Sequence, residues 1–409
     1  MTSPSFANPF RPGAGHMPPY LAGREAEKLD FLRQLKQDVI LENLILTGLR
    51  GVGKTVLLDT FKPLAIEKGW LWAGTDLSES VSLTEERMAI RLLTDLSLVT
   101  SSITLTSKQI KNIGFVPQIK DVTHYLDYHF LKAFYDQTPG MASDKLKAVL
   151  ELSWKWLQSL QRPGLVFSYD ESQNLADHTA QGEFPLSLLL DVFQSIQKKN
   201  IPFMLVLTGL PTLFPKLVEA RTFAERMFHV MFLDRLNESD SRDAIQKPIQ
   251  DAKCPLPMGT KMINRIVNIS GGYPYFIQFL GREVYDVVLQ LMTRDGTQKA
   301  GRFPVPFDQI IRKLDTDFFT SRWSKATDRQ KQLLTVVARL PNSDREFTVQ
   351  EVVEKSKEVL GKPFSSSHTN QMLVKLSDAG LVYKNRHGRY SFAVPLMNRF
   401  IIRQAESSI

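Results

Sequence analysis

The residues with the clearest chemistry lie in a glycine-rich segment in the first quarter of the chain. Residues 48–55 read Gly-Leu-Arg-Gly-Val-Gly-Lys-Thr, which fits the phosphate-binding loop pattern G-x-x-x-x-G-K-[ST]. In such a loop, backbone N–H groups surround the phosphates, Lys54 contacts the β- and γ-phosphates, and the Thr55 hydroxyl binds Mg²⁺. We therefore expect ATP or ADP, with Mg²⁺, to bind Gly48, Leu49, Arg50, Gly51, Val52, Gly53, Lys54, Thr55 and Val56.

Two later segments carry polar side chains at the ends of apolar runs. In "LVFSYDES", Asp170 is expected to hold Mg²⁺ through its water shell, and Glu171 to deprotonate the attacking water. Thr208 ends the run "FMLVLT". If the strand before the phosphate loop lies beside the acidic strand, the next strand can bring the Thr208 hydroxyl near the γ-phosphate. A buried threonine that only caps its strand is the alternative. Lys54, Glu171 and Thr208 are thus candidate catalytic residues.

Composition describes an ordinary globular protein. The chain has 409 residues, 43% of them hydrophobic and 23% charged, which predicts two or three domains. One cysteine, Cys254, excludes an intrachain disulfide and a cysteine-based zinc cluster. The absence of a signal pattern and of an apolar run of about 18 residues predicts a cytoplasmic protein without membrane contact.

The elements around these motifs alternate between strand and helix. Strands are predicted over residues 43–48, 70–77, 164–172 and 201–211, and helices over 24–38, 54–69, 82–99, 143–161 and 185–200. This order predicts an α/β P-loop NTPase fold, a parallel sheet with helices on both faces, over residues 21–233 after an N-terminal arm, 1–20. Residues 101–141 fit the alternation poorly, so we expect an insertion there that could bind a partner protein.

The rest of the chain reads as two smaller domains. Four helical segments predict an all-helical lid over residues 234–320. Three helices and a hairpin turning at "NRHG" then predict a winged helix-turn-helix over 322–405. Residues 301–409 hold 18 Lys and Arg against 11 Asp and Glu, a net of +7 within the total of +8, which suits a polyanion. The expected contacts to duplex DNA are Ser366, Ser367, Asn370 and Gln371 on the third helix and Lys384, Arg386 and Arg389 on the wing.

These motifs together resemble the AAA+/STAND superfamily. The arm, the phosphate loop, Asp170-Glu171, "LTGLP", "RTFAERMF" and "SGGYPYFIQ" look most like the origin-recognition-like ATPases of bacteria and archaea that carry a C-terminal winged helix. The resemblance implies that Leu21, Arg24 and Pro274 contact the adenine. It also implies that ATP-bound subunits form a homo-oligomer in which Arg226 reaches a neighbour's γ-phosphate. An ordinary surface arginine is the alternative for Arg226.

One departure from the family pattern concerns the lid. The sensor arginine expected after the glycine pair is replaced by Tyr273-Pro274-Tyr275, and the nearest arginine is Arg282. Two functions follow from the sequence. The first is an ATPase whose nucleotide state controls a DNA-binding winged helix. The second is a STAND-type signalling switch, in which the winged helix packs on its own ATPase and oligomerisation transmits a signal.

Overall fold

A computed structural model describes residues 7–13, 15–37, 39–102, 104–113, 116–253, 258–295, 304–386 and 388–407. Cys254 lies outside these residues. The chain divides into two compact units. The sheet unit comprises Glu25–Thr47 and Leu57–Phe232, and the loop unit comprises Met1–Arg24, Gly48–Val56 and Leu233–Ile409. The phosphate loop thus belongs to the same unit as the arm, the lid and the C-terminal elements.

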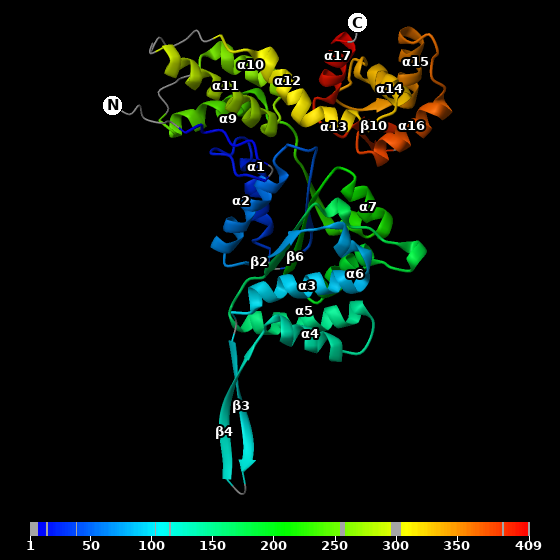
Figure 1. The fold of residues 1–409 in the computed structure, drawn as a ribbon. Coiled ribbons are helices and arrows are strands. Elements are labelled where there is room, and N and C mark those ends of the chain that lie inside the picture. Colours follow the sequence, from blue (N-terminus) through cyan, green and yellow to red (C-terminus); the bar gives the residue numbers. More distant parts are fainter. Residues whose placement is uncertain are drawn as a thin grey trace. The chain divides into compact units, whose positions relative to one another are not determined.

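The sheet unit is built on five parallel strands (Figure 1). They are β1 (Asn43–Thr47), β2 (Leu71–Asp76), β5 (Leu165–Asp170), β6 (Phe203–Gly209) and β7 (Phe228–Phe232), in the order β2-β5-β6-β1-β7. This confirms the predicted parallel sheet and corrects one expectation, since β6 lies between β1 and the acidic strand β5. Strand order follows from how the crossover helices pack on the sheet, and this packing cannot be read from the local pattern.

Helices cover both faces of the sheet because its buried strands are apolar on both sides. One core contains Phe167 of β5 and Leu205 of β6 together with α3 (Glu85–Thr100), α5 (Ala142–Ser159) and α6 (Pro185–Gln197). On the other face, Phe31 of α1 (Glu25–Gln34) stacks on Phe61 of α2 (Lys54–Glu67) with ring centroids 4.2 Å apart. The shorter elements are η1 (Glu79–Leu83), η2 (Ser172–Asn174), η3 (Thr179–Gln181), α7 (Leu213–Ala220) and α8 (Ala224–Met227).

The predicted insertion divides into a ribbon and a packed helix. Strands β3 (Thr104–Ile113) and β4 (Val116–Tyr125) form an antiparallel hairpin that projects away from the sheet and helices of its unit (Figure 1). Helix α4 (Tyr128–Gln137), by contrast, buries Leu131 and Tyr135 in the core, and the Tyr135 hydroxyl donates to Glu86 over 2.8 Å. Only the ribbon therefore stands outside the layered fold.

The part of the loop unit that follows β7 begins with four helices, the lid helices. Helices α9 (Glu238–Asp251), α10 (Thr260–Ser270), α11 (Pro274–Asp295) and α12 (Phe307–Leu314) match the four predicted segments. The N-terminal arm packs on them: Phe10 is 2% exposed, and a Cβ placed on Gly281 of α11 would lie 2.6 Å from its ring. The Lys247 ammonium donates to the Tyr20 hydroxyl over 2.8 Å. The described part of the arm is thus held against the lid helices.

The C-terminal elements follow the predicted order of three helices and a hairpin. A π-helix, η4 (Asp315–Thr320), and α13 (Ser321–Trp323) lead from α12 into α14 (Asp328–Ala338), α15 (Val349–Val359) and α16 (Ser366–Asp378). Strands β8 (Phe347–Thr348), β9 (Val382–Arg386) and β10 (Arg389–Phe392) form an antiparallel sheet in the order β8-β10-β9. Strand β8 and helix α17 (Met397–Ser407) were not predicted from the sequence. We call residues 328–407 the C-terminal module.

Helix α17 joins this module to the lid helices. Arg403 Nε donates to Asp315 Oδ2 over 2.9 Å, and Arg399 Nη1 donates to the Asn268 carbonyl over 2.6 Å. Phe400 stacks on Phe319 with centroids 5.1 Å apart. The module is therefore anchored through α17. No helix in the described part of the chain is long and apolar enough to cross a membrane.

Candidate nucleotide-binding site

The phosphate loop follows directly from β1 and has the backbone that its glycines allow. Gly48, Gly51 and Gly53 all have positive φ, at 155°, 77° and 92°. A Cβ on Gly48 would lie 2.4 Å from the Leu233 carbonyl oxygen, whereas a Cβ on Gly53 would meet nothing within 4 Å. The first glycine is thus required by packing, and the last leaves open space beside the lysine, where phosphates could approach the backbone closely.

Lys54 spans its own loop. Its ammonium donates to the carbonyl of Gly48 over 2.8 Å and to that of Leu49 over 3.0 Å. Thr55 and Val56 follow in the first turn of α2, at the positive end of the helix dipole. The loop therefore presents a cation and a helix N-terminus together, which is the chemistry that binds phosphate.

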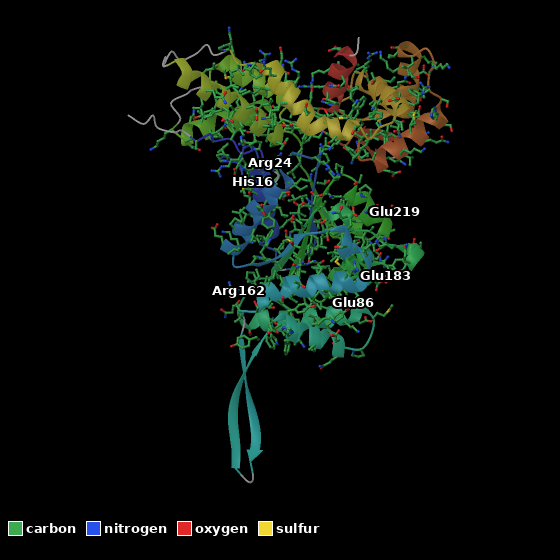
Figure 2. All side chains as sticks on the ribbon, viewed as in Figure 1. His16, Arg24, Glu86, Arg162, Glu183 and Glu219 are labelled. Carbon is green, nitrogen blue, oxygen red and sulfur yellow. The ribbon has the colours of Figure 1, made fainter. Side chains whose placement is uncertain are left out.

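Arg24 fixes the loop from the arm side (labelled in Figure 2). Its side chain is 5% exposed, and Nη2 donates to the carbonyls of Val52 over 3.0 Å and Asp234 over 2.7 Å. Leu21 is half-buried three residues before it. The guanidinium thus ties the loop to the segment that leads into the lid. This positioning role was not predicted from the sequence, and the expected contact of Arg24 with adenine stays a prediction.

The lid contacts the loop through the start of α11. The Tyr275 amide donates to the Gly51 carbonyl over 3.1 Å, one residue after Pro274 begins the helix. A Cβ on Gly51 would lie 3.0 Å from the Tyr275 Cβ. A displacement of the loop backbone at Gly51 would therefore break this hydrogen bond or move the start of α11.

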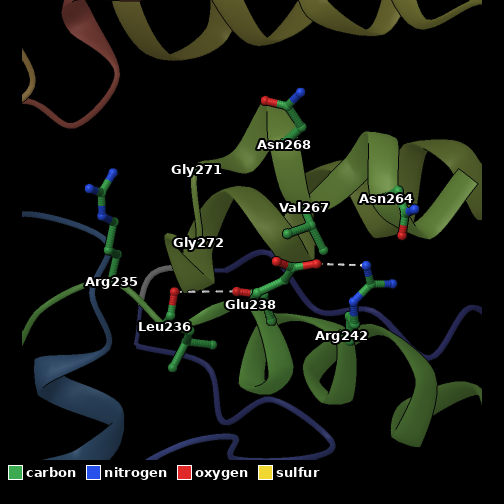
Figure 3. A pocket seen from close by; sticks show the side chains of 10 residues that line it. Arg235, Leu236, Glu238, Arg242, Asn264, Val267, Asn268, Gly271 and Gly272 are labelled. Atoms are coloured by element: carbon green, nitrogen blue, oxygen red, sulfur yellow. Dashed lines mark hydrogen bonds and ion pairs between the residues drawn. The ribbon is translucent and has the colours of Figure 1, made fainter. Parts of the chain in front are cut away.

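The glycine pair before this contact is explained by the turn it makes. Gly271 and Gly272 have φ of 59° and 80°, and a Cβ on Gly272 would lie 2.4 Å from the Leu236 carbonyl. They line a hollow of about 390 Å³ between α9 and α10 (Figure 3). Arg242 in this hollow is paired with Glu238 at 2.7 Å. The motif "GGYP" thus turns the chain from α10 so that α11 starts at the loop.

In the sheet unit, the acidic pair stands at the end of β5. Asp170 is 5% exposed and its Oδ1 accepts the Glu171 amide over 2.7 Å. Glu171 is exposed and has a φ of 51°, in the left-handed region that residues other than glycine rarely adopt. Such backbone strain is concentrated at functional sites. The two carboxyl groups are therefore adjacent but set in different surroundings, one buried and one in solvent.

The end of β6 carries an unpaired buried hydroxyl. Thr208 is fully buried, and its Oγ1 has no hydrogen-bond partner among the described residues. Thr47, the last residue of β1, is 3% exposed and has an unpaired hydroxyl as well. The register pairs Leu46 with Thr208 and Thr47 with Gly209, so the two threonines lie near the carboxyl ends of adjacent strands with their side chains on opposite faces of the sheet. A buried hydroxyl without a partner is unusual, and Thr208 would be satisfied by a ligand that accepts a hydrogen bond.

Sequence analysis missed Gln173, which connects the two strand ends. Its Nε2 donates to Glu171, and its Oε1 accepts the Leu210 amide over 3.2 Å. Lys216 donates to the Gln173 carbonyl over 2.9 Å, and burial lowers the pKa of this lysine. The only signal in the sequence is the position of Gln173, two residues after Glu171. It is a candidate for positioning the Glu171 carboxylate.

Arg226 lies at the opposite edge of the sheet. It is exposed in α8, two residues before β7, and β7 begins opposite Asn43, the first residue of β1. Thr47, at the other end of β1, precedes the phosphate loop. Arg226 makes no hydrogen bond or ion pair through its side chain within the described residues. Its expected role toward a neighbouring subunit stays a prediction.

The expected DNA contacts belong to α16 and to the hairpin of β9 and β10 in the C-terminal module. Helix α16 buries Met372, Leu373 and Leu376. Lys384 of β9 is exposed, Arg389 lies 3.8 Å from Glu346, and the side chain of Arg386 is outside the described residues. The remaining candidates are exposed on α16: Ser366, Ser367, Asn370 and Gln371.

Comparisons with known proteins agree with this geometry. A family model described as a domain of unknown function, DUF8462, matches residues 316–401. No curated protein matches the sequence significantly. The Walker-type ATPase PABY2304 of Pyrococcus abyssi has a similar structure, with 14% identity, a TM-score of 0.56, and coverage of 93% of this chain and 96% of that one.

The ORC2 protein of Aeropyrum pernix in its ADP form is also similar, with 14% identity, a TM-score of 0.55, and coverage of 97% of this chain and 98% of that one. A second ORC2 structure, of its ADPNP-ADP complexes, has 12% identity, a TM-score of 0.51 and the same coverage. At these identities the likeness establishes the fold. This chain has the fold of origin-recognition-like AAA+ P-loop ATPases over most of its length.

Proposed function

We propose that this chain binds and hydrolyses ATP and that its nucleotide state controls DNA binding by a winged helix-turn-helix, the C-terminal module. The observation that carries the ATPase proposal is the sheet edge. The phosphate loop continues from Thr47, while the buried Thr208 hydroxyl and the Asp170-Glu171 pair end the neighbouring strands β6 and β5 at the same edge. The unpaired Thr208 hydroxyl at this edge is a hydrogen-bond donor that a phosphate or water oxygen would satisfy.

In this proposal, each residue has one task. Lys54 binds the β- and γ-phosphates, and Glu171 takes a proton from the water that attacks the γ-phosphorus as the bond to the β-phosphate oxygen breaks. The Thr208 hydroxyl donates to the γ-phosphate or to that water. Thr55 and, through water, Asp170 would hold Mg²⁺, which offsets the phosphate charge when bound. Gln173 keeps the Glu171 carboxylate in position.

DNA binding is supported by which surfaces of the C-terminal module are buried and which are exposed. Its α17 contacts the lid helices, while the polar residues of α16 and the cation Lys384 stay exposed. Recognition helices of this class place such residues in the major groove, and wing cations contact phosphates. Because α17 is anchored to the lid, a lid movement on nucleotide exchange would reorient the exposed face.

A STAND-type switch is the second candidate, and the α17 contacts favour it. The Arg403–Asp315 pair and the Arg399 contact hold the module on the lid, as expected for a winged helix that packs on its own ATPase. Steady-state ATP hydrolysis with and without duplex DNA separates the two. DNA stimulation supports the first candidate, whereas tightly copurifying ADP with no response to DNA supports the switch.

We further propose that ATP-bound subunits assemble and that Arg226 completes the site of a neighbour. Among the described residues its guanidinium has no partner, and it precedes β7 at the end of the sheet opposite to Thr47, the residue before the phosphate loop. An arginine supplied in trans can be worth roughly 10³–10⁵ in rate. Activity per subunit should rise with protein concentration, and mixing inactive Lys54→Ala with inactive Arg226→Ala subunits should restore it. Unchanged activity of Arg226→Ala over a hundredfold dilution would reduce Arg226 to a surface residue.

The projecting β3–β4 ribbon is a proposed site for a protein partner. A two-stranded ribbon has two open edges and no core of its own, so it gains stability from a partner that adds a strand or covers a face. Deleting residues 104–125 should leave nucleotide binding unchanged and remove that partner, as measured by pull-down with the intact chain as reference.

A further inference from the structure

The lid lacks the arginine that its resemblance predicts, but another arginine is connected to the phosphate loop through two aromatic side chains. Arg282 in α11 is exposed, and its guanidinium lies 4.0 Å from the Asp286 carboxylate one turn further along the same helix. Arg322 instead belongs to α13, on the helical path that runs from Phe307 to Trp323 and includes the π-helix η4 (α12 and α13 in Figure 1). π-Helical turns are rare and are frequent at functional sites.

Three contacts lead from the loop to Arg322. The Gly51 carbonyl accepts the Tyr275 amide over 3.1 Å. The Tyr275 ring lies 5.2 Å from the ring of Phe318, and the Arg322 guanidinium lies over the other end of this pair, 4.7 Å from the Phe318 centroid. The guanidinium also donates to the Phe318 carbonyl. Arg322 is therefore held rigidly, one aromatic pair away from the loop.

The charge of Arg322 has no carboxylate to balance it. Among the described residues, neither Arg322 nor the exposed loop residue Arg50 forms an ion pair. Burial and the positive charge of Arg50 both lower the pKa of Arg322. A half-buried guanidinium without an acidic partner is costly, and an anion bound beside it would offset that cost.

We propose that Arg322, together with Arg50, binds the terminal phosphate of the nucleoside triphosphate on the phosphate loop. The planar guanidinium is suited to bidentate phosphate contacts. Arg322 thereby distinguishes a triphosphate from a diphosphate. A movement of Arg322 on phosphate binding would reach α17 through two ring contacts. The Phe318 and Phe319 ring centroids are 5.0 Å apart, and Phe319 stacks on Phe400 of α17. This inference rests on the proposed ATP binding.

The test compares dissociation constants for the non-hydrolysable analogue AMPPNP and for ADP, using the full-length chain. Arg322→Ala should weaken AMPPNP binding roughly 10- to 100-fold and change ADP binding by less than about twofold. Arg50→Ala removes an exposed side chain and should give the same pattern even if Arg322→Ala folds poorly. Arg312→Ala, an exposed arginine on the same helical path, is the matched control and should change neither constant.

Equal losses for both nucleotides, or unchanged AMPPNP affinity, in Arg322→Ala and Arg50→Ala would overturn the role of this arginine pair and leave ATP binding intact. Failure of the unmodified chain to bind either nucleotide would overturn the proposed function and this inference together. Without nucleotide, removing either arginine relieves the repulsion, so the melting temperature of Arg50→Ala should not fall. A marked fall would show that the pair has a structural role instead.

Discussion

The two units differ in whether the polar groups of the candidate site already have hydrogen-bond partners. In the loop unit, the groups that would meet a nucleotide are already engaged with backbone: Lys54 and Arg24 donate to carbonyls, and Tyr275 donates to Gly51. At the sheet edge, Thr47 and Thr208 are buried with unpaired hydroxyls, and Glu171 sits in a strained turn. A group that gives up a backbone carbonyl oxygen for a phosphate oxygen keeps the same number of hydrogen bonds, so the exchange costs little free energy. A rigid group without a partner is already oriented to stabilise charge in a transition state. The loop unit is thus expected to govern affinity and the sheet unit to govern turnover.

The sharpest test of this division is Lys54→Ala. Loss of the ammonium removes the charged contact to both outer phosphates, so we expect ATP affinity to fall roughly 1,000-fold or more. Isothermal titration measures it, with thermal unfolding as the check that the fold survives. ATP binding within tenfold of the unmodified chain would contradict the loop unit's control of affinity.

Glu171→Gln addresses the sheet unit. The amide keeps the size of the side chain and its contact with Gln173 but cannot accept a proton, so kcat should fall about 10²- to 10³-fold while ATP affinity stays within a few-fold. Gln173→Ala should give a smaller loss of kcat. Near-normal hydrolysis by Glu171→Gln would remove this residue from the role of base.

The wing tests whether the loop unit also governs DNA affinity. Replacing Lys384, Arg386 and Arg389 together in the full-length chain should lower duplex affinity at low salt and flatten the salt dependence by up to about three phosphate contacts. Because Arg389 lies near Glu346, its share should be the smallest. Binding that is absent at low salt in the unmodified chain would favour the self-packing switch.

The smallest effect is expected from the paired substitutions Thr208→Val and Thr47→Val. Each removes a buried, unpaired hydroxyl, so each should leave the free energy of unfolding unchanged or raise it by up to about 1 kcal/mol. Only Thr208→Val should slow hydrolysis, by about tenfold. Chemical denaturation and turnover measured on both variants separate the effects. Normal turnover in Thr208→Val would make Thr208 a buried strand cap.

The sequence by itself determined which residues are candidates for the chemistry and the types of the elements. The spacing of Gly48, Gly53 and Lys54 predicted a phosphate loop, because only glycine allows the backbone to approach phosphates so closely. Apolar runs that end in Asp170 or Thr208 predicted buried parallel strands, and helical periodicity predicted the four lid helices and α16. These are local properties, and the tertiary structure did not change them.

Only the tertiary structure decided which of these elements meet. It placed β6 between β1 and β5, bound the arm to the lid through Phe10, and used Arg24 to hold the loop. It also connected Arg322 to the distant phosphate loop through Phe318 and Tyr275. Contacts of this kind depend on crossover order and on packing between distant helices, and no local pattern encodes them. The same is true of α17, whose arginines anchor the C-terminal module by capping carbonyls and pairing with Asp315 far along the chain.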